Sequence, residues 1–316
     1  MEKVKVLVTT CGSVNGLNVI GALKSQKEIP VEIYASDCDE YAVGKLYADY
    51  FYISKNVKEG IEFIKDIIWY CTENKIKYMF PTHSCELELL KDFEDRFKNA
   101  GINIMLPSRK NLDNNTKLKM MKIFEGIVLY PKIYFGPYAS VEYPCFIKNS
   151  YGSGSTYAKK IENPIELTLR ERLTPYPIVQ EYIEGNEYTI NCLFDKDSKL
   201  IGCIPIQRIK TKNGMSVVSE TSKEDYEYLK AKCEQIGEEI SAIGPVNIQV
   251  IKSKEDGQYY FIEINPRFAC GTLPTAVAAG FNIPLLMLKM MMGKEVEELK
   301  DYKNVIVYRP MGAKIG

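Results

Sequence analysis

The chain has 316 residues, of which 46% are hydrophobic and 26% are charged. This composition is typical of a globular protein of two or three domains, because one domain usually spans about 100–200 residues. Its 41 basic and 41 acidic residues give a formal net charge of zero, which argues against a nucleic-acid partner or a polybasic membrane surface. No run of about 18 apolar residues is present, so no membrane-spanning helix is predicted.

The nine cysteines are irregularly spaced, form no C-x-x-C motif and accompany a single histidine, His83. A zinc site of cysteines and histidines is therefore not expected. Scattered thiols favour a reducing compartment, so we predict a cytoplasmic protein. The apolar run near the N-terminus is too short for a signal peptide and favours a β-strand.

Along roughly the first third of the chain, β-branched strand patterns alternate with helical periodicity. Strands are predicted at residues 3–9, 31–35, 78–81 and 103–106, and helices at residues 17–25, 60–74 and 85–100. This β-α-β order with short connections predicts a parallel doubly wound sheet.

The pattern changes after Pro107, where a Lys-rich helix is predicted at residues 112–123. Antiparallel strands are then predicted at residues 187–194, 199–206, 246–251 and 259–265, with a helix at residues 225–243. We therefore predict an N-terminal α/β domain over residues 1–108 and an α+β domain with antiparallel sheets over residues 109–316.

Two strand-like segments carry the strongest functional signal, VNIQVIK (246–252) and QYYFIEINPRF (258–268). Asp256-Gly257 between them favours a hairpin turn. Because side chains alternate across a strand, polar and apolar residues of this hairpin should separate onto two faces. The predicted apolar face holds Val246, Ile248 and Val250 of the first strand and Tyr260, Ile262 and Ile264 of the second.

On the polar face, the predicted pairing places Gln249 opposite Glu263 and Asn247 near Asn265. These oxygen donors carry one formal charge among them, which suits Mg²⁺, an ion that also keeps waters and substrate phosphates as ligands. Arg267 follows two residues after Asn265, where a guanidinium can fork onto a phosphate. An ordinary solvated hairpin face is the alternative, but such a face usually carries Lys, Glu and Thr.

A second candidate is the segment PCFIKNSYGSGSTYAKK (144–160), in which a short strand delivers Lys148 to a loop of small residues. Backbone N–H groups at glycines and side-chain hydroxyls suit a phosphate, although the Walker A pattern is absent. An ordinary hairpin loop explains the segment equally well. The loop comprises Gly152, Ser153, Gly154, Ser155 and Thr156.

A third candidate is the segment IVQEYIEGNEYTINCLF (178–194). Its extended residues 180–183 offer backbone groups for an adenine edge, and Glu187 offers a carboxylate for ribose hydroxyls. Taken alone, the segment is explained better as two strands joined by a turn.

Two further features carry weaker signals. Gly12 and Gly16 follow the first strand, but their spacing does not match G-x-G-x-x-G, so a simple glycine turn is favoured over an NAD(P) site with Asp37 as ribose ligand. His83 and Cys85 lie two residues apart on a turn, which disfavours a nucleophilic pair.

Together these segments resemble the ATP-grasp superfamily. The run GPVNIQVIKSKEDGQYYFIEINPRFACGTLP is similar to the metal-binding core in the synthetase halves of carbamoyl phosphate synthetase large subunits and in related carboxylate–amine ligases. The loop at 148–155 and the run VQEYIEGNEYT occur in the order and spacing of that superfamily. The resemblance covers most of the chain and implies a lid subdomain over residues 109–180 and a metal-binding subdomain over residues 181–316.

The resemblance also implies roles for individual residues. It makes Gln249, Glu263 and Asn265 ligands of two Mg²⁺ ions, with Mn²⁺ as an alternative. Arg267 would hold the transferred phosphoryl group, and Arg208 would contact phosphate or substrate. Lys117 matches an earlier ATP-contacting lysine, with Lys119 as its competitor. The other residues assigned to ATP are Lys148, Gly152, Ser153, Gly154, Ser155, Glu181, Tyr182, Ile183 and Glu187.

The implied activity is ATP-dependent joining of a carboxylate to an amine, or to a thiol, through an acyl phosphate, with ADP and phosphate as products. The chain has room for one synthetase half, so we predict a stand-alone ligase of small molecules, and a homodimer stays open. The alternatives are a stand-alone enzyme that forms carboxyphosphate or phosphorylates carbamate, a non-catalytic nucleotide-binding module and an NAD(P)-dependent oxidoreductase. No feature of the sequence names either substrate.

Overall fold

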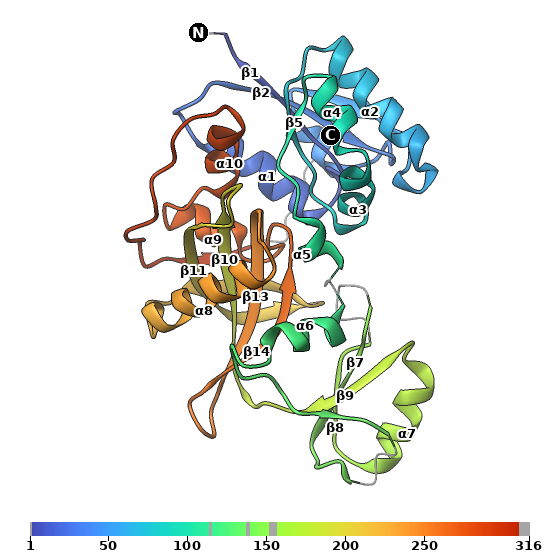
Figure 1. The fold of residues 1–316 in the computed structure, drawn as a ribbon, viewed down its shortest axis with the longest axis vertical. Helices are drawn as coiled ribbons and strands as arrows, with labels where there is room; N and C mark the ends of the chain where they lie inside the picture. Colours follow the sequence, from blue (N-terminus) through green and yellow to red (C-terminus); the bar gives the residue numbers. More distant parts are fainter. Residues whose placement is uncertain (1, 114–115, 137–139, 152–156, 310–316) are drawn as a thin grey trace.

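The structure is a computed structural model that describes residues 2–113, 116–136, 140–151 and 157–309. Figure 1 shows an N-terminal α/β domain at the top, a central body built on an antiparallel sheet, and a smaller lid below it. The predicted fold class, a parallel α/β domain followed by an α+β domain with antiparallel sheets, is confirmed.

The N-terminal domain contains a five-stranded parallel sheet in the order β3-β2-β1-β4-β5. Its strands are β1 (Val4–Val8), β2 (Val31–Asp37), β3 (Tyr50–Ile53), β4 (Tyr78–Phe80) and β5 (Asn103–Ile104). Its helices are α1 (Val14–Ser25), η1 (Val43–Leu46), η2 (Val57–Glu59), α2 (Ile61–Glu73), α3 (Ser84–Asp92) and α4 (Glu94–Asn99). Successive residues of β1 point to opposite faces, so Val6 packs toward α1 and Leu7 toward α2 and α3.

Two elements of this domain differ from the prediction. The strand β3 was not predicted, because its residues are half exposed at the sheet edge and lack a buried apolar run. The helix predicted over residues 85–100 is two helices, since Phe93 leaves the helical conformation (φ −117°, ψ 17°) between α3 and α4.

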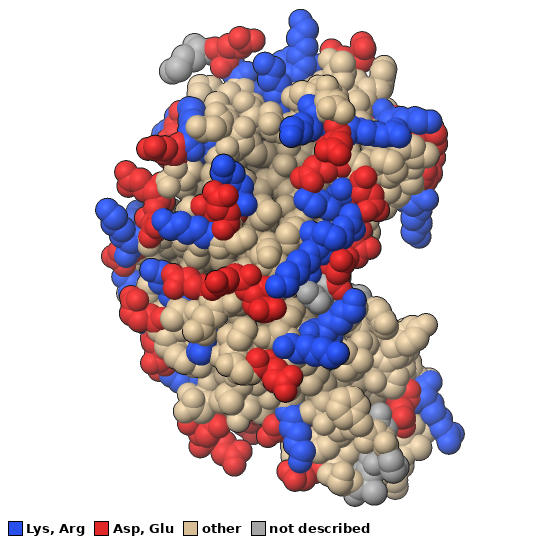
Figure 2. Space-filling model, viewed as in Figure 1, with Lys and Arg blue, Asp and Glu red and all other residues tan. Residues whose placement is uncertain are grey.

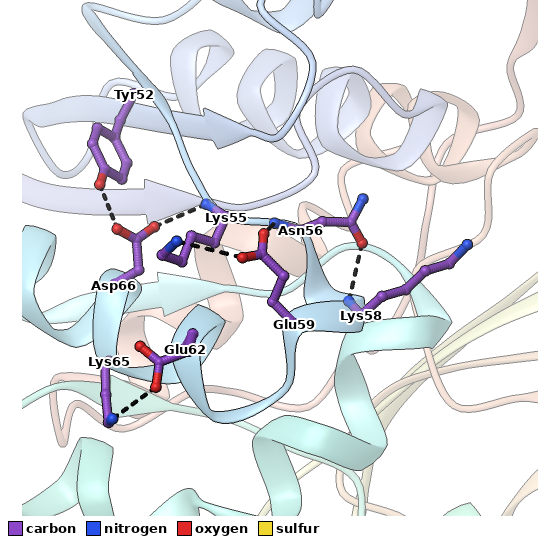
Figure 3. A network of polar contacts seen from close by, with 8 residues as sticks. All are labelled: Tyr52, Lys55, Asn56, Lys58, Glu59, Glu62, Lys65 and Asp66. Atoms are coloured by element: carbon purple, nitrogen blue, oxygen red, sulfur yellow. Dashed lines mark hydrogen bonds and ion pairs between the residues drawn. The ribbon is translucent and has the colours of Figure 1, made fainter.

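Polar contacts hold the segment after β3 against α2 (Figure 3). Asp66 accepts hydrogen bonds from the Tyr52 hydroxyl at 2.6 Å and from the Lys55 backbone N–H at 2.9 Å. Asn56 and Glu59 form a capping box at the start of η2, an arrangement that satisfies two otherwise unpaired backbone donors. These contacts add to the packing of Tyr52 on Tyr70 in holding the edge of the sheet.

Gly16 has a different role from the predicted turn. It lies inside the first turn of α1, where an added Cβ would come within 2.6 Å of the Thr10 carbonyl oxygen. The residue therefore allows the helix to approach the loop after β1 closely. Asp37 accepts a hydrogen bond from the Gly12 N–H at 2.8 Å, so its carboxylate holds this loop.

The central body contains a six-stranded antiparallel sheet in the order β14-β13-β10-β11-β12-β15. Its strands are β10 (Gly185–Phe194), β11 (Leu200–Lys212), β12 (Met215–Thr221), β13 (Gly244–Ser253), β14 (Tyr259–Asn265) and β15 (Ile306–Tyr308). One face packs on α6 (Lys117–Phe124) and α8 (Tyr226–Glu239). The other shares a continuous core with α9 (Leu273–Ala278), α10 (Ile283–Met291) and α1 of the N-terminal domain.

The lid is a four-stranded antiparallel sheet in the order β6-β9-β7-β8, covered by α7 (Pro164–Leu173). Its strands are β6 (Ile133–Tyr134), β7 (Cys145–Asn149), β8 (Lys159–Ile161) and β9 (Pro177–Glu181). The remaining helix, α5 (Arg109–Asp113), follows the predicted domain boundary at residue 108.

The surface carries no extended region of one charge on the face drawn in Figure 2, where basic and acidic side chains are interspersed. Within the described ranges, no helix is long and apolar enough to cross a bilayer.

Candidate functional site

A cavity of about 680 Å³ lies between the lid and the central sheet. Strands β7 and β9 of the lid form one wall, and strands β10, β13 and β14 of the central body form the other. The N-terminal end of α6 contributes Lys117. A cavity of this size is typical of a site for a small-molecule ligand.

The hairpin β13–β14 forms the polar wall with the predicted register. Gln249 pairs with Glu263 and Asn247 pairs with Asn265, and all four line the cavity. The opposite face of β13 carries Val246, Ile248 and Val250 into the core of the central body. Two-residue alternation therefore places the oxygen donors together, as the sequence indicated.

Two side chains predicted on the apolar face of this hairpin, Ile262 and Tyr260, lie outside the core. The pairing shifts by one residue between Gln249 and Val250, because Val250 pairs with Phe261 and leaves Ile262 as an extra residue. This bulge puts both Ile262 and Glu263 on the cavity side, while Phe261 replaces Ile262 in the core. Tyr260 likewise lies outside the core, and its ring hydroxyl bonds to Asp256.

A closed set of hydrogen bonds fixes the amides at the end of the hairpin. The Asn265 amide donates to Asn247 Oδ1 at 3.3 Å, and the Asn247 amide donates to the Arg267 carbonyl oxygen at 3.0 Å. Arg267 Nη2 in turn donates to Asn265 Oδ1 at 3.2 Å. Both asparagines are buried, so their oxygen atoms are oriented before any ligand arrives.

The donor set suits a hard cation. Gln249, Glu263 and Asn265 supply oxygen atoms and a single carboxylate, the ligands that Mg²⁺ takes in combination with waters and phosphates. Among the described residues, no cluster of three or more His, Cys, Asp or Glu side chains could hold a metal ion. A softer, all-protein metal site is therefore not supported within those ranges.

The lid wall contributes a buried lysine. Lys148, on β7, is only 8% exposed, and burial lowers its pKa to about 8, although the Glu263 carboxylate opposes the shift. An anion that enters the cavity would supply a counter-charge and so stabilise the protonated form of this ammonium group.

Two lysines of α6 point in different directions. Lys117 Nζ lies 3.7 Å from Glu263 Oε1, and the residue lines the cavity. Lys119 Nζ instead donates to the Asp113 carbonyl oxygen at 2.7 Å on the exposed side. The structure thus brings Lys117, and not Lys119, to the cavity.

The predicted adenine segment lies at the end of β9. Glu181, Tyr182 and Ile183 line the cavity, and the Glu181 backbone N–H donates to the Lys132 carbonyl oxygen at 2.8 Å. The Tyr182 ring stacks on Phe146 with centroids 6.5 Å apart, which gives this end of the cavity an aromatic wall.

Glu187 and Arg208, which were assigned separate roles, form an ion pair. Arg208 Nη1 donates to Glu187 Oε2 at 2.9 Å, Nε donates to Ser216 Oγ at 3.1 Å, and Nη2 donates to the Gly214 carbonyl oxygen at 2.6 Å. Both residues line the cavity. This pairing across β10 and β11 is not apparent from the sequence.

The predicted phosphate loop falls outside the described residues, because Gly152, Ser153, Gly154, Ser155 and Thr156 are not among them. Its flanking residues Tyr151 and Tyr157 line the cavity.

His83 and Cys85, which were not expected to form a nucleophilic pair, are in contact. His83 Nδ1 lies 2.9 Å from Cys85 Sγ, and the ring also accepts from the Cys85 backbone N–H as the cap of α3. Burial raises the pKa of the Cys85 thiol, which opposes a reactive thiolate. The contact is therefore a helix cap rather than a nucleophilic pair.

Sequence reasoning missed several residues that line the cavity, among them Ile262 and Cys270. Ile262 reaches it only through the bulge, which no sequence pattern marks. Cys270 reaches it from the loop after β14, where its Sγ accepts from Arg267 Nη1 at 3.4 Å.

A small lid sheet that closes over an antiparallel sheet, preceded in the chain by a parallel α/β domain, defines the ATP-grasp class of fold. Residues 174–313 match a family model described as ATP-grasp in the biosynthetic pathway with Ter operon, and residues 6–105 match a PylC-like N-terminal domain. The chain belongs to the ATP-grasp superfamily.

Similar proteins agree with this membership. Mitochondrial acetyl-CoA carboxylase of Saccharomyces cerevisiae is 21% identical over 184 residues, which cover 54% of this chain and 8% of that protein. The carbamoyl phosphate synthase large chain of a Thermoanaerobacter species is 25% identical over 173 residues, which cover 50% of this chain and 16% of that protein. The chain thus spans less than a fifth of either relative.

A solved structure shares the fold over nearly the whole chain. The biotin carboxylase domain of Hydrogenobacter thermophilus 2-oxoglutarate carboxylase superposes with a TM-score of 0.74 at 18% identity, covering 96% of this chain and 73% of that one. Its title describes a dimer in complex with MgADP, ADP and bicarbonate.

Proposed function

We propose that this chain is an ATP-dependent ligase that joins a carboxylate to an amine through an acyl-phosphate intermediate. One observation carries the proposal: the oxygen donors Gln249, Glu263 and Asn265 line one cavity together with Lys117 and Lys148. Oxygen ligands for a cation together with ammonium groups match the charge pattern of a metal–triphosphate complex.

The cavity residues divide between the two ends of ATP. The aromatic end with Tyr182 and Ile183 would hold adenine, and the lysines would hold the phosphates. Divalent cations on the hairpin, two Mg²⁺ in our proposal, would neutralise charge on the β and γ phosphates. Arg267 would hold the phosphoryl group during transfer, because its guanidinium lies beside Asn265.

The pairing of Glu187 with Arg208 refines the roles proposed for them. Each satisfies the other in the free protein, so ribose hydroxyls would have to share Glu187 with the guanidinium. We propose that Glu187 binds ribose with its second carboxylate oxygen, while Arg208 keeps that carboxylate in place.

Catalysis follows from positioning. A carboxylate oxygen of the substrate attacks the γ-phosphorus, and the bond to ADP breaks. An acyl phosphate forms, and the guanidinium of Arg267 offsets its negative charge. The amine nitrogen then attacks the acyl carbon, loses its proton and displaces phosphate. The lid excludes water, so that the amine rather than water reacts.

Two attributes extend the proposal beyond the site. The nine cysteines are free thiols in the structure, which supports a reducing compartment such as the cytoplasm. A homodimer is supported by the dimer named for the Hydrogenobacter domain, and sedimentation velocity would test it.

The deciding experiment is a screen of carboxylate and amine pairs with MgATP, reading ADP and phosphate release. Bicarbonate belongs among the carboxylates, because the Hydrogenobacter domain is described with it and carboxyphosphate formation is the closest variant of the proposed chemistry. We expect ADP formation that depends on both substrates. The proposal fails if no pair releases ADP and if MgATP also leaves the free energy of unfolding unchanged. A ligand at 100-fold its Kd should raise that free energy by roughly 2.7 kcal/mol.

A further inference from the structure

Arg267 is held by a residue of the other domain. Its Nε donates to Ser84 Oγ at 3.0 Å, although the two residues lie 183 positions apart. Ser84 begins α3 in the N-terminal domain, whereas Arg267 follows β14 in the central body. A guanidinium proposed to hold a phosphoryl group is thus oriented partly from outside the domain that carries it.

The other donors of Arg267 are also engaged. Nη1 donates to the Phe268 carbonyl oxygen at 3.1 Å and to Cys270 Sγ at 3.4 Å, and Nη2 donates to Asn265 Oδ1 at 3.2 Å. A guanidinium has five N–H bonds. Ser84 takes the N–H at Nε, and Phe268, Cys270 and Asn265 take three more. One free N–H and the N–H bound weakly to sulfur remain for a ligand, and the plane of the group fixes where they point.

Ser84 itself stands on a rigid turn. Glu86, which is 1% exposed, accepts from the Thr82 backbone N–H at 3.0 Å, from the His83 backbone N–H at 3.1 Å and from Thr10 Oγ1 at 3.0 Å. The carboxylate therefore clamps the β4–α3 turn to the loop after β1. Movement of the Ser84 backbone would require this buried cluster to move with it.

A second contact closes the same domain boundary. Asn18 on α1 donates to the Cys270 carbonyl oxygen at 2.8 Å, so the loop that follows Arg267 is tied to the N-terminal domain at two points. Beneath them, α1 and the central sheet share one hydrophobic core. The N-terminal domain and the Arg267 loop are therefore fixed relative to one another.

We propose that Ser84 is a positioning residue for Arg267, through which the N-terminal domain sets the geometry of phosphoryl transfer. The inference rests on the proposed function in giving Arg267 its role. Removing the Ser84 hydroxyl takes away the hydrogen bond at Nε and leaves the guanidinium held only through Nη1 and Nη2, so the contact of Nη2 with Asn265 Oδ1 loosens. Ser84 thereby acts on two groups of the cavity without touching the ligand.

The test compares Ser84→Ala with Ser84→Thr, which keeps the hydroxyl, and with Ser25→Ala. Ser25 is a matched control, because its hydroxyl also lies in the N-terminal domain but bonds only the Ala22 carbonyl oxygen, at 3.0 Å. The assay measures kcat and KM for MgATP with the substrate pair found in the screen, and calorimetry measures binding of MgADP and of a non-hydrolysable ATP analogue with Mg²⁺.

We expect Ser84→Ala to lower kcat about tenfold, the loss typical of one hydrogen bond to a charged group, with a smaller rise in KM for ATP that parallels the loss of affinity for the analogue. Its preference for the ATP analogue over MgADP should fall, because Arg267 contacts the part of ATP that ADP lacks. Ser84→Thr should recover most of the loss, and Ser25→Ala should match wild type. In an Arg267→Ala background, Ser84→Ala should change analogue affinity no further.

The outcomes separate the two proposals. If wild type binds neither nucleotide and forms no ADP, the proposed function fails and this inference falls with it. If wild type is active and Ser84→Ala equals it, only the positioning role is overturned. The role is also overturned if Ser84→Ala lowers analogue affinity as much without Arg267 as with it, or if Ser84→Thr is as impaired as Ser84→Ala.

Discussion

The wall of the cavity formed by β13 and β14 carries neutral amides and one carboxylate, whereas the lid wall carries the buried ammonium group of Lys148. On the hairpin, local alternation places Gln249 and Glu263 side by side, and hydrogen bonds orient the amides. On the lid, Lys148 is buried by the fold around it and has a lowered pKa. One wall is thus organised before a ligand binds, and the other holds a charge at an energetic cost until a ligand arrives.

The difference separates what each wall contributes. The hairpin is stable without a ligand, because its donors are polar but mostly uncharged. The lid gains stability from an anion, because a buried ammonium without a close counter-charge opposes folding. Substitutions on the hairpin should therefore change catalysis more than stability, and those on the lid should change both.

The largest effect is expected on the hairpin. Glu263→Gln removes the only carboxylate among the proposed cation ligands and the partner of Lys117. We expect kcat to fall roughly 10²–10³-fold, as for loss of one preorganised electrostatic stabiliser. Steady-state ADP formation measures it, and the neighbouring Gln258→Glu, in the exposed hairpin turn, is the control. Native turnover in Glu263→Gln would rule out the cation site.

Lys148→Met tests the lid wall. We expect MgATP affinity to fall about tenfold or more with the loss of a charge-assisted contact. The free protein should become more stable at pH 7, on the order of 3 kcal/mol, since a pKa lowered from 10.5 to about 8 measures the cost of the buried charge. Calorimetry and urea unfolding report the two changes. A less stable variant would contradict the comparison between the walls.

The pH dependence sharpens the same point. Below about pH 8 Lys148 is protonated in both the folded and unfolded chains, so the cost of its burial is fully present. Between pH 8 and 10.5 the unfolded chain binds more protons, so stability of the free protein should rise with pH. MgATP binding should weaken up to about tenfold from pH 7 to pH 9. A flat wild-type profile, or the same slope in Lys148→Met, would exclude Lys148 as the cause.

The smallest effect distinguishes two lysines of one helix. Lys117→Met should weaken MgATP binding by about fivefold, a modest loss because its ammonium is already shared with Glu263. Lys119→Met should leave affinity at the wild-type value, because Lys119 bonds the Asp113 carbonyl oxygen on the exposed side. Equal losses in the two variants would mean that α6 as a whole, rather than one side chain, affects binding.

Sequence patterns predicted the parts of this site that depend on local periodicity. Spacing and turn chemistry predicted the register of Gln249 with Glu263 and the turn at Asp256-Gly257. They also predicted the order of the two kinds of domain along the chain. The tie from Ser84 to Arg267 could not be predicted, because it joins residues 183 positions apart through the packing of two domains.

Other differences also have local physical reasons. Gly16 looked like a turn residue but serves close packing of a helix on the loop after β1. The edge strand β3 has no buried apolar run to reveal it. The ion pair between Glu187 and Arg208 depends on neighbouring strands whose pairing the sequence did not specify.

The extra residue in β14 has a consequence of its own. On either side of Ile262 the alternation is regular, with Phe261 and Ile264 in the core. Removing Ile262 would therefore leave all the remaining side chains of the hairpin on the faces that they occupy now. The insertion therefore adds one branched aliphatic side chain to the cavity wall, next in the chain to Glu263, and leaves the rest of the hairpin unchanged. A single inserted amino acid thus sets an apolar side chain beside the proposed cation ligands without disturbing their pairing.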